Sequence, residues 1–244
     1  MNLLGVSSGI SSSMTNIGLW LGLGSVFLGQ CTVVAYYYTY QRIYKRHKLS
    51  YNFTQAIIDH FSQLEGFILL ASYLTISWYF QALPPSYYIY EGSVVWSDVA
   101  LQLIVQDAGQ YVMHRFEHKC KSLYRIGHRY HHKHIHPMWF HSFEGSLVDT
   151  VTMVVLPLIV TSRICSHVNV WSYMAFGTIY SGMLVLIHSE FNHPWEDGFR
   201  LLGIGTATDH HMHHRFFTCN YGHIFMWWDY LGGTHYVQQR KLKC

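Results

Sequence analysis

The sequence predicts an all-α integral membrane protein with about four to five transmembrane or re-entrant helices and a cytosolic helical cap. Half of the 244 residues are hydrophobic and 12% are charged, which is roughly half the charged fraction usual in soluble domains. Several long stretches lack charge, and the histidines gather in a few segments, most densely in His128–His141. We expect the cap to hold a histidine-rich site for two metal ions.

Two apolar segments precede the histidine-rich part of the chain. Residues 17–40 contain no charged residue over a length sufficient to span a bilayer. This segment holds four glycines, which favour close helix packing: Gly18, Gly22, Gly24 and Gly29. Residues 64–83 form the second apolar segment, and two prolines follow it.

Three more apolar segments lie between the histidine clusters or beside them. Residues 94–113 include four polar side chains that should face protein rather than lipid: Asp98, Gln102, Gln106 and Asp107. Residues 147–160 and 168–187 are separated by the short stretch TSRICSH. This spacing predicts a helical hairpin.

Basic residues predict the orientation of the chain. Four of them follow the first apolar segment and should remain cytosolic: Arg42, Lys45, Arg46 and Lys48. Counting crossings then puts residues 114–146 and 189–244 in the cytosol, with the N-terminus lumenal and Cys244 cytosolic. The sequon at Asn52 is expected to be cytosolic and therefore unglycosylated. We expect a multi-pass protein of the endoplasmic reticulum membrane with its active site on the cytosolic side.

The cysteines and the net charge exclude several classes. Five cysteines are scattered along the chain without a CxxC pair, so neither a disulfide framework nor a zinc ribbon is indicated. The formal net charge is +3 and no basic stripe is present. We therefore expect no nucleic-acid partner.

Three histidine clusters have the spacing of metal ligands. Eight histidines belong to them: His114 and His118; His128, His131 and His132; His210, His213 and His214. On a helix, i, i+3 and i+4 share one face, so each cluster can direct several imidazoles at one centre. Imidazole suits iron, zinc and copper, and eight exceed the three or four protein ligands of a zinc site. Two metal ions are therefore expected, whereas isolated histidines should be ordinary surface or core residues: His47, His60, His167, His223 and His235.

The three histidine clusters and the residues around them resemble the fatty acid hydroxylase/sterol desaturase superfamily of membrane di-iron enzymes. The resemblance covers roughly Ser97–Tyr236 and rests on three stretches: DAGQYVMHRFEH, HSEFNHPW and HHRFFTCNYGHIFMWWDYLGGT. It divides the chain into an N-terminal tail with two transmembrane helices (1–92), a catalytic domain (93–236) and a short basic tail (237–244). Glu190 departs from the glycine common in the family, and Leu184 stands where some members have a further histidine.

The resemblance implies that His188 is a ninth ligand and that the metals are two iron ions, cycling between Fe2+ and Fe3+, with zinc as an adventitious occupant. It also implies supporting or extra-ligand roles for further residues: His193, His211, His141, Asp107, Glu144, Asn220 and Asp229. His193 could replace or supplement a ligand. His134, His136 and His141 are expected to support ligands or lie at the surface.

The activity that the resemblance implies is oxidation of a lipid C–H bond with O2, by hydroxylation or desaturation. Sterol, fatty acyl and sphingoid substrates all fit. The chain shows no flavin or nicotinamide motif, so electrons should come from an external donor such as cytochrome b5 and its reductase. Five basic residues form a face that could receive an acidic donor or be ordinary positive-inside charge: Lys119, Lys121, Arg125, Arg129 and Lys133.

A histidine-rich membrane metal transporter or metal-storage protein is the alternative from another class. Such a protein would place its ligands near the middle of the membrane spans. The three histidine clusters lie at the ends of the predicted spans or beyond them. This position favours the O2-dependent lipid oxidation over metal transport or storage.

Overall fold

The computed structural model describes residues 12–44 and 51–236. Some residues used in the sequence predictions lie outside this part of the chain: Lys45, Arg46, His47, Lys48 and the C-terminal tail 237–244 with Cys244.

The regular elements of the described residues are helices, as the sequence predicts, and one isolated antiparallel bridge joins Ile204 to Phe225. The α-helices are α1 (Ser12–Tyr44), α2 (Phe53–Phe61), α3 (Leu64–Tyr79), α4 (Trp96–Lys119), α5 (Lys121–Ile126), α6 (Leu147–Thr150), α7 (Leu156–Ile164), α8 (Val170–Ile187), α9 (Glu196–Leu201), α10 (Ala207–Phe216) and α11 (Trp227–Gly232). The short elements are η1 (Pro85–Tyr88), η2 (His131–Lys133), η3 (Trp139–His141) and the π-helical η4 (Val151–Val155).

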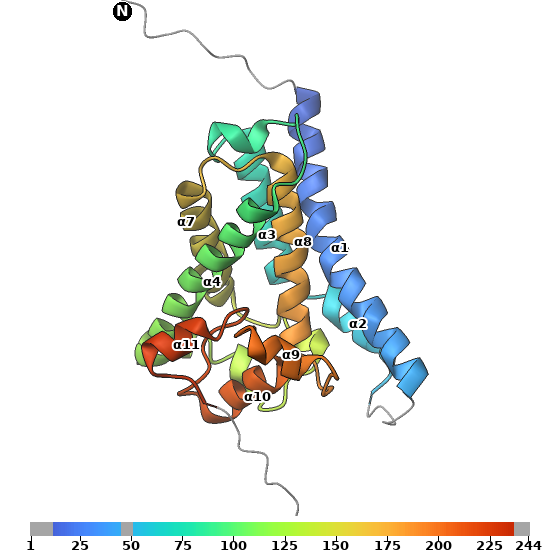
Figure 1. Cartoon of the computed structure of the whole chain (residues 1–244), viewed down its shortest axis with the longest axis vertical. Coiled ribbons are helices and arrows are strands. Elements are labelled where there is room, and N and C mark those ends of the chain that lie inside the picture. Colours follow the sequence, from blue (N-terminus) through green and yellow to red (C-terminus); the bar gives the residue numbers. More distant parts are fainter. Residues whose placement is uncertain (1–11, 45–50, 237–244) are drawn as a thin grey trace, which may run out of the picture.

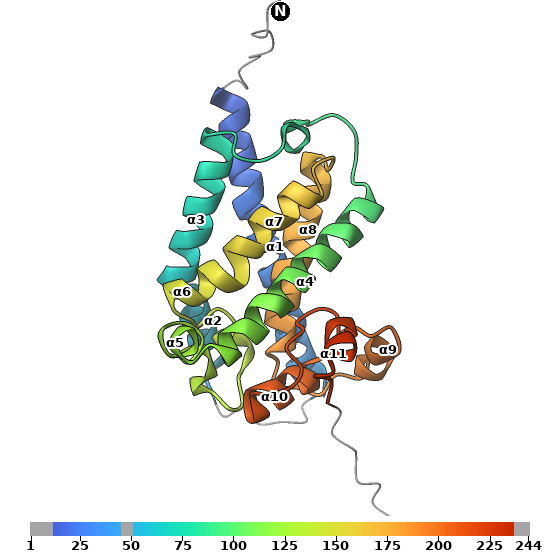
Figure 2. The same ribbon diagram turned by 90° about the vertical axis from the view of Figure 1, so that its left-hand side faces the viewer.

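The long helices lie side by side, and the short helices gather at one end of them. Figures 1 and 2 show α1, α3, α4, α7 and α8 forming the bundle, with α2, α9, α10 and α11 at its lower end. In the described residues, three stretches are long and apolar enough to cross a membrane: Thr15–Ile43, Leu147–Ile164 and Val170–Ile187. The helical membrane class is thus confirmed, and the two predicted segments 147–160 and 168–187 correspond to the continuous stretch α6–η4–α7 and to α8.

The other two predicted segments form α3 and α4. Helix α3 has 16 residues, fewer than the ~20 of a typical span, and α4 contains buried polar residues. Gln102, Gln106 and Asp107 are fully buried, so these side chains face protein, as predicted. Gln106 donates to the Tyr180 hydroxyl (3.2 Å) and accepts from Thr161 (3.1 Å).

Three of the four glycines in α1 lie against other helices. A Cβ at Gly18 would meet the Trp78 ring, at Gly22 it would meet Leu74, and at Gly29 it would lie 2.0 Å from the Thr178 carbonyl oxygen. Small residues therefore let α1 approach α3 and α8 closely. Gly24 is different, because nothing lies within 4 Å of a Cβ built there; the packing role predicted for it is wrong.

Gly29→Leu should destabilise the bundle by about 1–3 kcal/mol, because the added side chain forces α1 away from the α8 backbone. Thermal unfolding of the detergent-solubilised protein measures the loss. Gly24→Leu is the matched control on the same helix and should change the unfolding temperature little. Equal effects of the two substitutions would contradict the close α1–α8 contact.

Candidate metal centre

The nine histidines predicted as ligands converge. Figure 1 shows that α10 and the ends of α4 and α8 meet at the lower end of the bundle. Helix α4 provides His114 and His118 in its last two turns, and α10 provides the third cluster. The second cluster lies in the connection after α5, partly within η2. His188 is the C-cap residue of α8. Four separate parts of the chain therefore meet at one place.

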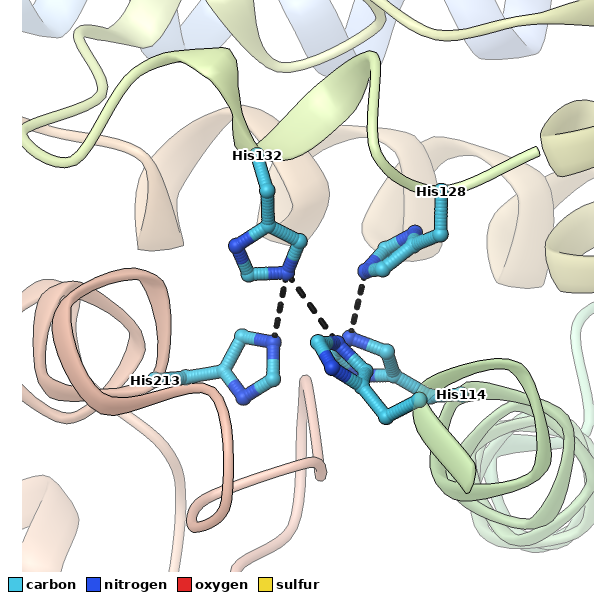
Figure 3. Close-up of side chains that lie close together, drawn as sticks. His114, His128, His132 and His213 are labelled. Atoms are coloured by element: carbon cyan, nitrogen blue, oxygen red, sulfur yellow. Dashed lines mark hydrogen bonds between the residues drawn. The ribbon is translucent and has the colours of Figure 1, made fainter. Parts of the chain in front are cut away.

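The nine histidines form two groups in which the candidate ligand atoms lie within 4.8 Å of one another. The first group contains five residues: His114, His118, His128, His132 and His213. The second contains four: His131, His188, His210 and His214. Figure 3 shows four members of the first group pointing toward one another from α4, α10 and the connection between them.

This partition corrects one part of the sequence prediction. Helical spacing allows each cluster to direct several imidazoles at one centre, but His131 and His132 belong to different groups, as do His213 and His214. Consecutive residues of a helical turn point in directions about 100° apart. Neighbouring histidines therefore reach separate centres, and two clusters link the groups.

Hydrogen bonds fix which ring nitrogen carries the proton in six of the nine imidazoles. Each of these rings donates from Nδ1 to an oxygen: His114 to Tyr221 (2.7 Å), His131 to Glu144 (3.1 Å), His188 to Leu184 (2.7 Å), His213 to Cys219 (2.8 Å), His214 to His134 (2.9 Å), and His128 to the Asp149 carboxylate (2.7 Å). The first five acceptors are backbone carbonyls, which can only accept. In the neutral ring, Nε2 then has a free lone pair, the form that binds metals.

The free Nε2 atoms face one another. His114 and His128 approach to 2.9 Å and His131 and His188 to 3.3 Å through these nitrogens. In both pairs the protons are on Nδ1, so the contact joins two lone pairs and is not a hydrogen bond. A cation between such nitrogens converts repulsion into coordination. The donor set therefore fits a metal ion in each group.

Burial keeps these imidazoles uncharged. It lowers the pKa of His131 to about 4 and that of His118 to about 3, and the neighbouring histidine His128 adds repulsion against a second positive charge. The pKa values of His114, His188, His210, His213 and His214 are likewise well below the usual range, first because of burial and then because of the other histidines. Neutral rings at physiological pH are the state that metal coordination requires.

Two buried carboxyl groups support the first group, and the spacing of the histidine clusters does not identify either as a partner of His128. His128 Nδ1 lies 2.7 Å from Asp149 and 3.4 Å from Glu117. Glu117 is fully buried and accepts from the Thr152 hydroxyl. Burial, together with the neighbouring Asp149, raises the pKa of Glu117 to about 8, so Glu117 keeps a proton near neutral pH.

Asp107, Asp229 and Asn220, predicted as supporting residues, hold backbone close to the histidines. Asp107 accepts the backbone N–H groups of residues 223–225, at distances from 2.8 to 3.2 Å. Asp229 accepts those of Tyr221 (2.8 Å) and Gly222 (2.7 Å). Asn220 donates to the Asp209 carbonyl at the start of α10 (3.1 Å). These contacts position the carbonyl of Tyr221, which accepts from His114.

Two other candidate residues, His193 and His211, lie outside the two groups. His193 uses both ring nitrogens on protein hydroxyls, Nδ1 with Tyr36 and Nε2 with Ser189, each at 2.9 Å. The structure thus brings His188, and not His193, to the other histidines. His211 belongs to neither group, and its Nε2 has no hydrogen-bond partner among the described residues.

His134, His141 and Glu144 form a half-buried cluster beside the site. Glu144 contacts Lys133 and accepts from His134 Nε2 (3.0 Å). His141 Nδ1 accepts the Met138 N–H (3.1 Å), so a neutral His141 carries its proton on Nε2 and offers no free nitrogen lone pair. His136 is exposed. This geometry supports the non-ligand assignment for the three histidines.

The structure places His223 beside the groups, although its sequence context suggests an ordinary residue. Its side chain is 5% exposed. Its ring centroid lies 4.9 Å from that of His114 and 5.2 Å from that of His210, which belong to different groups. Spacing alone could not have revealed His223, because only the fold of residues 220–225 brings it there.

A mostly apolar cavity extends from the histidines between α1, α3 and α8. His128, His131, His188 and His223 line its lower end. Along α8 the lining continues from Leu184 to Tyr173. The 15 residues between Tyr173 and His188 correspond to roughly 22 Å of helix. The cavity is therefore long enough to hold an extended lipid.

Comparison with known proteins identifies the family. The Fatty acid hydroxylase model matches residues 99–234, more than half of the chain. The chain belongs to the fatty acid hydroxylase family. The predicted class, O2-dependent lipid and sterol oxidoreductases, is thereby confirmed at the level of the family.

Several proteins similar to this chain have names that refer to sterol or squalene chemistry. An alternative squalene epoxidase of Phaeodactylum tricornutum is 43% identical over 229 residues, covering 90% of this chain and 66% of the relative. A Delta(7)-sterol 5(6)-desaturase of Gibberella zeae is 31% identical (55% of this chain, 40% of the relative), and methylsterol monooxygenase 1 of Danio rerio is 25% identical (57% and 49%). The chain thus spans less than two thirds of the length of each of these relatives. No solved structure matches.

His188→Ala should remove one of the two metal ions and abolish activity, because the second group has only four members. The protein should still insert into membranes and be extracted in normal yield. Elemental analysis of the purified protein counts the metals. His193→Gln is the control and should keep both metals. If His193→Gln loses a metal and His188→Ala does not, the ligand assignment moves to His193.

The metal-free protein should lose stability as the pH falls from about 6.5 toward 4. The folded state holds His131 at a pKa of about 4, whereas the unfolded state titrates near ~6.5, so acid favours the unfolded, proton-binding chain. Unfolding temperatures measured between these pH values test this. Above pH 6.5 the buried histidines add no further stability, and the raised pKa of Glu117, about 8, makes stability fall as the pH rises toward 8. The double variant His131→Gln/His188→Gln should have a shallower slope. A stability maximum in acid would contradict buried neutral imidazoles.

Proposed function

We propose that this chain is a membrane oxygenase that uses two iron ions, O2 and external electrons to epoxidise squalene or a closely related isoprenoid. The observation that carries the proposal is the meeting of nine imidazoles with the end of a long apolar cavity. The substrate comes from the squalene epoxidase relative, which aligns with 90% of this chain.

The reaction balances with one O2 and two electrons. Squalene, O2, two electrons and two protons give an epoxide and water. When bound, the iron ions would supply the activation of O2. The nine histidines would hold the ions, and the apolar walls would exclude water and place the terminal double bond near the site.

The shape and chemistry of the cavity fit an extended hydrocarbon. Tyr173, Phe176 and Tyr180 form a wall of stacked rings along α8, with neighbouring centroids 6.1 and 5.6 Å apart. These rings offer apolar contact over roughly half the length of the cavity. The charged residues of the lining, Glu144 and Asp149, lie against the histidines, so the rest of the wall is uncharged.

Hydroxylation or desaturation of a sterol is the second candidate. The Tyr73 and Tyr173 hydroxyls lie 3.2 Å apart at the far end of the cavity, roughly 22 Å along α8 from His188. This pair offers a hydrogen bond to a substrate hydroxyl, which squalene lacks. The names of two relatives, a Delta(7)-sterol 5(6)-desaturase and a methylsterol monooxygenase, refer to sterols, which carry such a hydroxyl.

Electrons would arrive from a soluble or membrane-anchored donor such as cytochrome b5 with its reductase. Basic residues around α5 are exposed: Lys119, Lys121, Arg125, Arg129 and Lys133. Tyr124 of the same helix lies between this surface and the first group, with its ring 5.3 Å from His118. An acidic donor docked on α5 would therefore stand close to that group.

The function is tested with the purified, iron-loaded protein in lipid nanodiscs, supplied with squalene, isotopically labelled O2, cytochrome b5 and its reductase. Incorporation of one labelled oxygen into an epoxide supports the proposal. Conversion of a sterol, with squalene left intact, would replace it with the second candidate. If the protein binds metal but consumes O2 with neither lipid, a histidine-rich transporter or storage protein becomes the better assignment.

Gly66→Phe should block the cavity and lower substrate turnover at least tenfold while both metals remain bound. Gly66 lines the cavity, and a Cβ built there meets only Phe143, at 4.0 Å, so the ring has room to enter. The effect should be a raised KM or lost binding of substrate. Gly24→Phe, on the exposed side of α1, is the control. Full activity of Gly66→Phe would exclude this cavity as the substrate site.

In cells we propose an endoplasmic reticulum location with the metal groups facing the cytosol. Asn52 caps α2, a helix that lies toward the lower end of the bundle, where α10 also lies (Figure 1). It should therefore remain unglycosylated in microsomes, as a glycosidase-induced mobility shift would report. An engineered sequon in the 84–93 connection at the opposite end should be modified. Glycosylation of Asn52 would reverse the orientation.

A further inference from the structure

We propose that His223 is a catalytic residue that donates a hydrogen bond to the small oxygen ligand held between the two histidine groups. The proposal rests on the proposed function, because it assumes a metal ion in each group. It assigns a role to a histidine outside the nine candidate ligands.

The first support is the position of His223. Its ring contacts His114 of the first group and His210 of the second, and it also lines the cavity. It is not a member of either group of candidate ligands. His223 therefore stands where the two metal sites and the substrate cavity meet, without joining either metal.

The second support is an unmet hydrogen-bonding requirement. The side chain is 95% buried, and Nδ1 lacks a hydrogen-bond partner among the described residues. A buried N–H without an acceptor is costly and therefore uncommon. Six of the nine candidate ligands donate from Nδ1 to their own oxygen acceptors and direct Nε2 into their group, so these six rings leave no nitrogen free to accept from His223. An oxygen ligand between the groups is the acceptor that the position favours.

The third support is the rigidity of the backbone that presents the ring. The N–H groups of His223, Ile224 and Phe225 all donate to the buried Asp107 carboxylate, at 3.2, 2.8 and 2.8 Å. The two preceding residues donate to Asp229. A loop held by two carboxylates places the imidazole with little freedom, which is the arrangement expected of a group that orients a reacting atom.

Azide tests the proposal, because it binds oxidised iron centres where oxygen ligands bind and accepts hydrogen bonds. Wild type, His223→Leu, His223→Gln and His167→Gln would be purified in detergent, loaded with iron and oxidised. Iron content would be measured first, and azide affinity would then follow from absorption spectra. Glutamine keeps an N–H donor, leucine does not, and His167 is an exposed histidine distant from the site.

All four proteins should bind two iron ions, and His223→Leu should bind azide about tenfold more weakly. His223→Gln and His167→Gln should bind azide like the wild type. If His223→Leu does not fold, His223→Met tests the same loss of the N–H group.

Loss of iron in both His223→Leu and His223→Gln would make the residue a ligand and overturn the proposal. Unchanged azide affinity in His223→Leu, with two iron ions bound, would also overturn it. Failure of the wild type to bind iron would instead refute the proposed function.

Discussion

The metal centre depends on the outward direction of the imidazole Nδ1 protons. A ring that donates from Nδ1 to a fixed oxygen must present Nε2 to the interior, and six rings do so here. Most of the acceptors are carbonyls that no helix uses. Leu184 lies in the last turn of α8, where carbonyls lack intrahelical partners, and the others lie in connecting segments. The ends of helices and the loops between them therefore create the centre.

This constraint also explains why the centre meets the membrane-facing cavity. Because His188 terminates α8, its Nδ1 satisfies an unpaired carbonyl of that helix while its Nε2 joins the second group. The helix that places this imidazole also provides the aromatic wall of the cavity. One helix therefore sets both the metal position and the substrate path, and their relative position follows from the regular rise of α8.

The sequence predicted the helical class, the apolar segments and the nine histidines because these features depend on local periodicity and on a family resemblance. The sequence could not predict which histidines belong to which of the two groups. Adjacent residues such as His131 and His132 point toward different groups only because the η2 turn forms. The sequence also could not reveal Asp149 or His223. Both come into contact with the histidines through tertiary packing, and Asp149 lies 21 residues from its partner His128. The family resemblance was needed to identify His188, because this residue belongs to none of the three histidine clusters.

The two groups take some of their histidines from different helices of the bundle, and this explains the buried polar residues of α4. The first group includes His114 and His118 of α4, and the second includes His188 of α8. The distance between the metals thus depends on how α4 lies against α8. The Tyr180 hydroxyl joins these helices, because it accepts from Gln106 (3.2 Å) and donates to Gln110 (3.1 Å). Hydrogen bonds between helices in an apolar surrounding contribute only about 0.6 kcal/mol each on average, so their value here lies in direction: they fix the register in which α4 and α8 present their histidines. Polar residues that weaken α4 as a membrane span thereby maintain the spacing that chemistry at two metals requires.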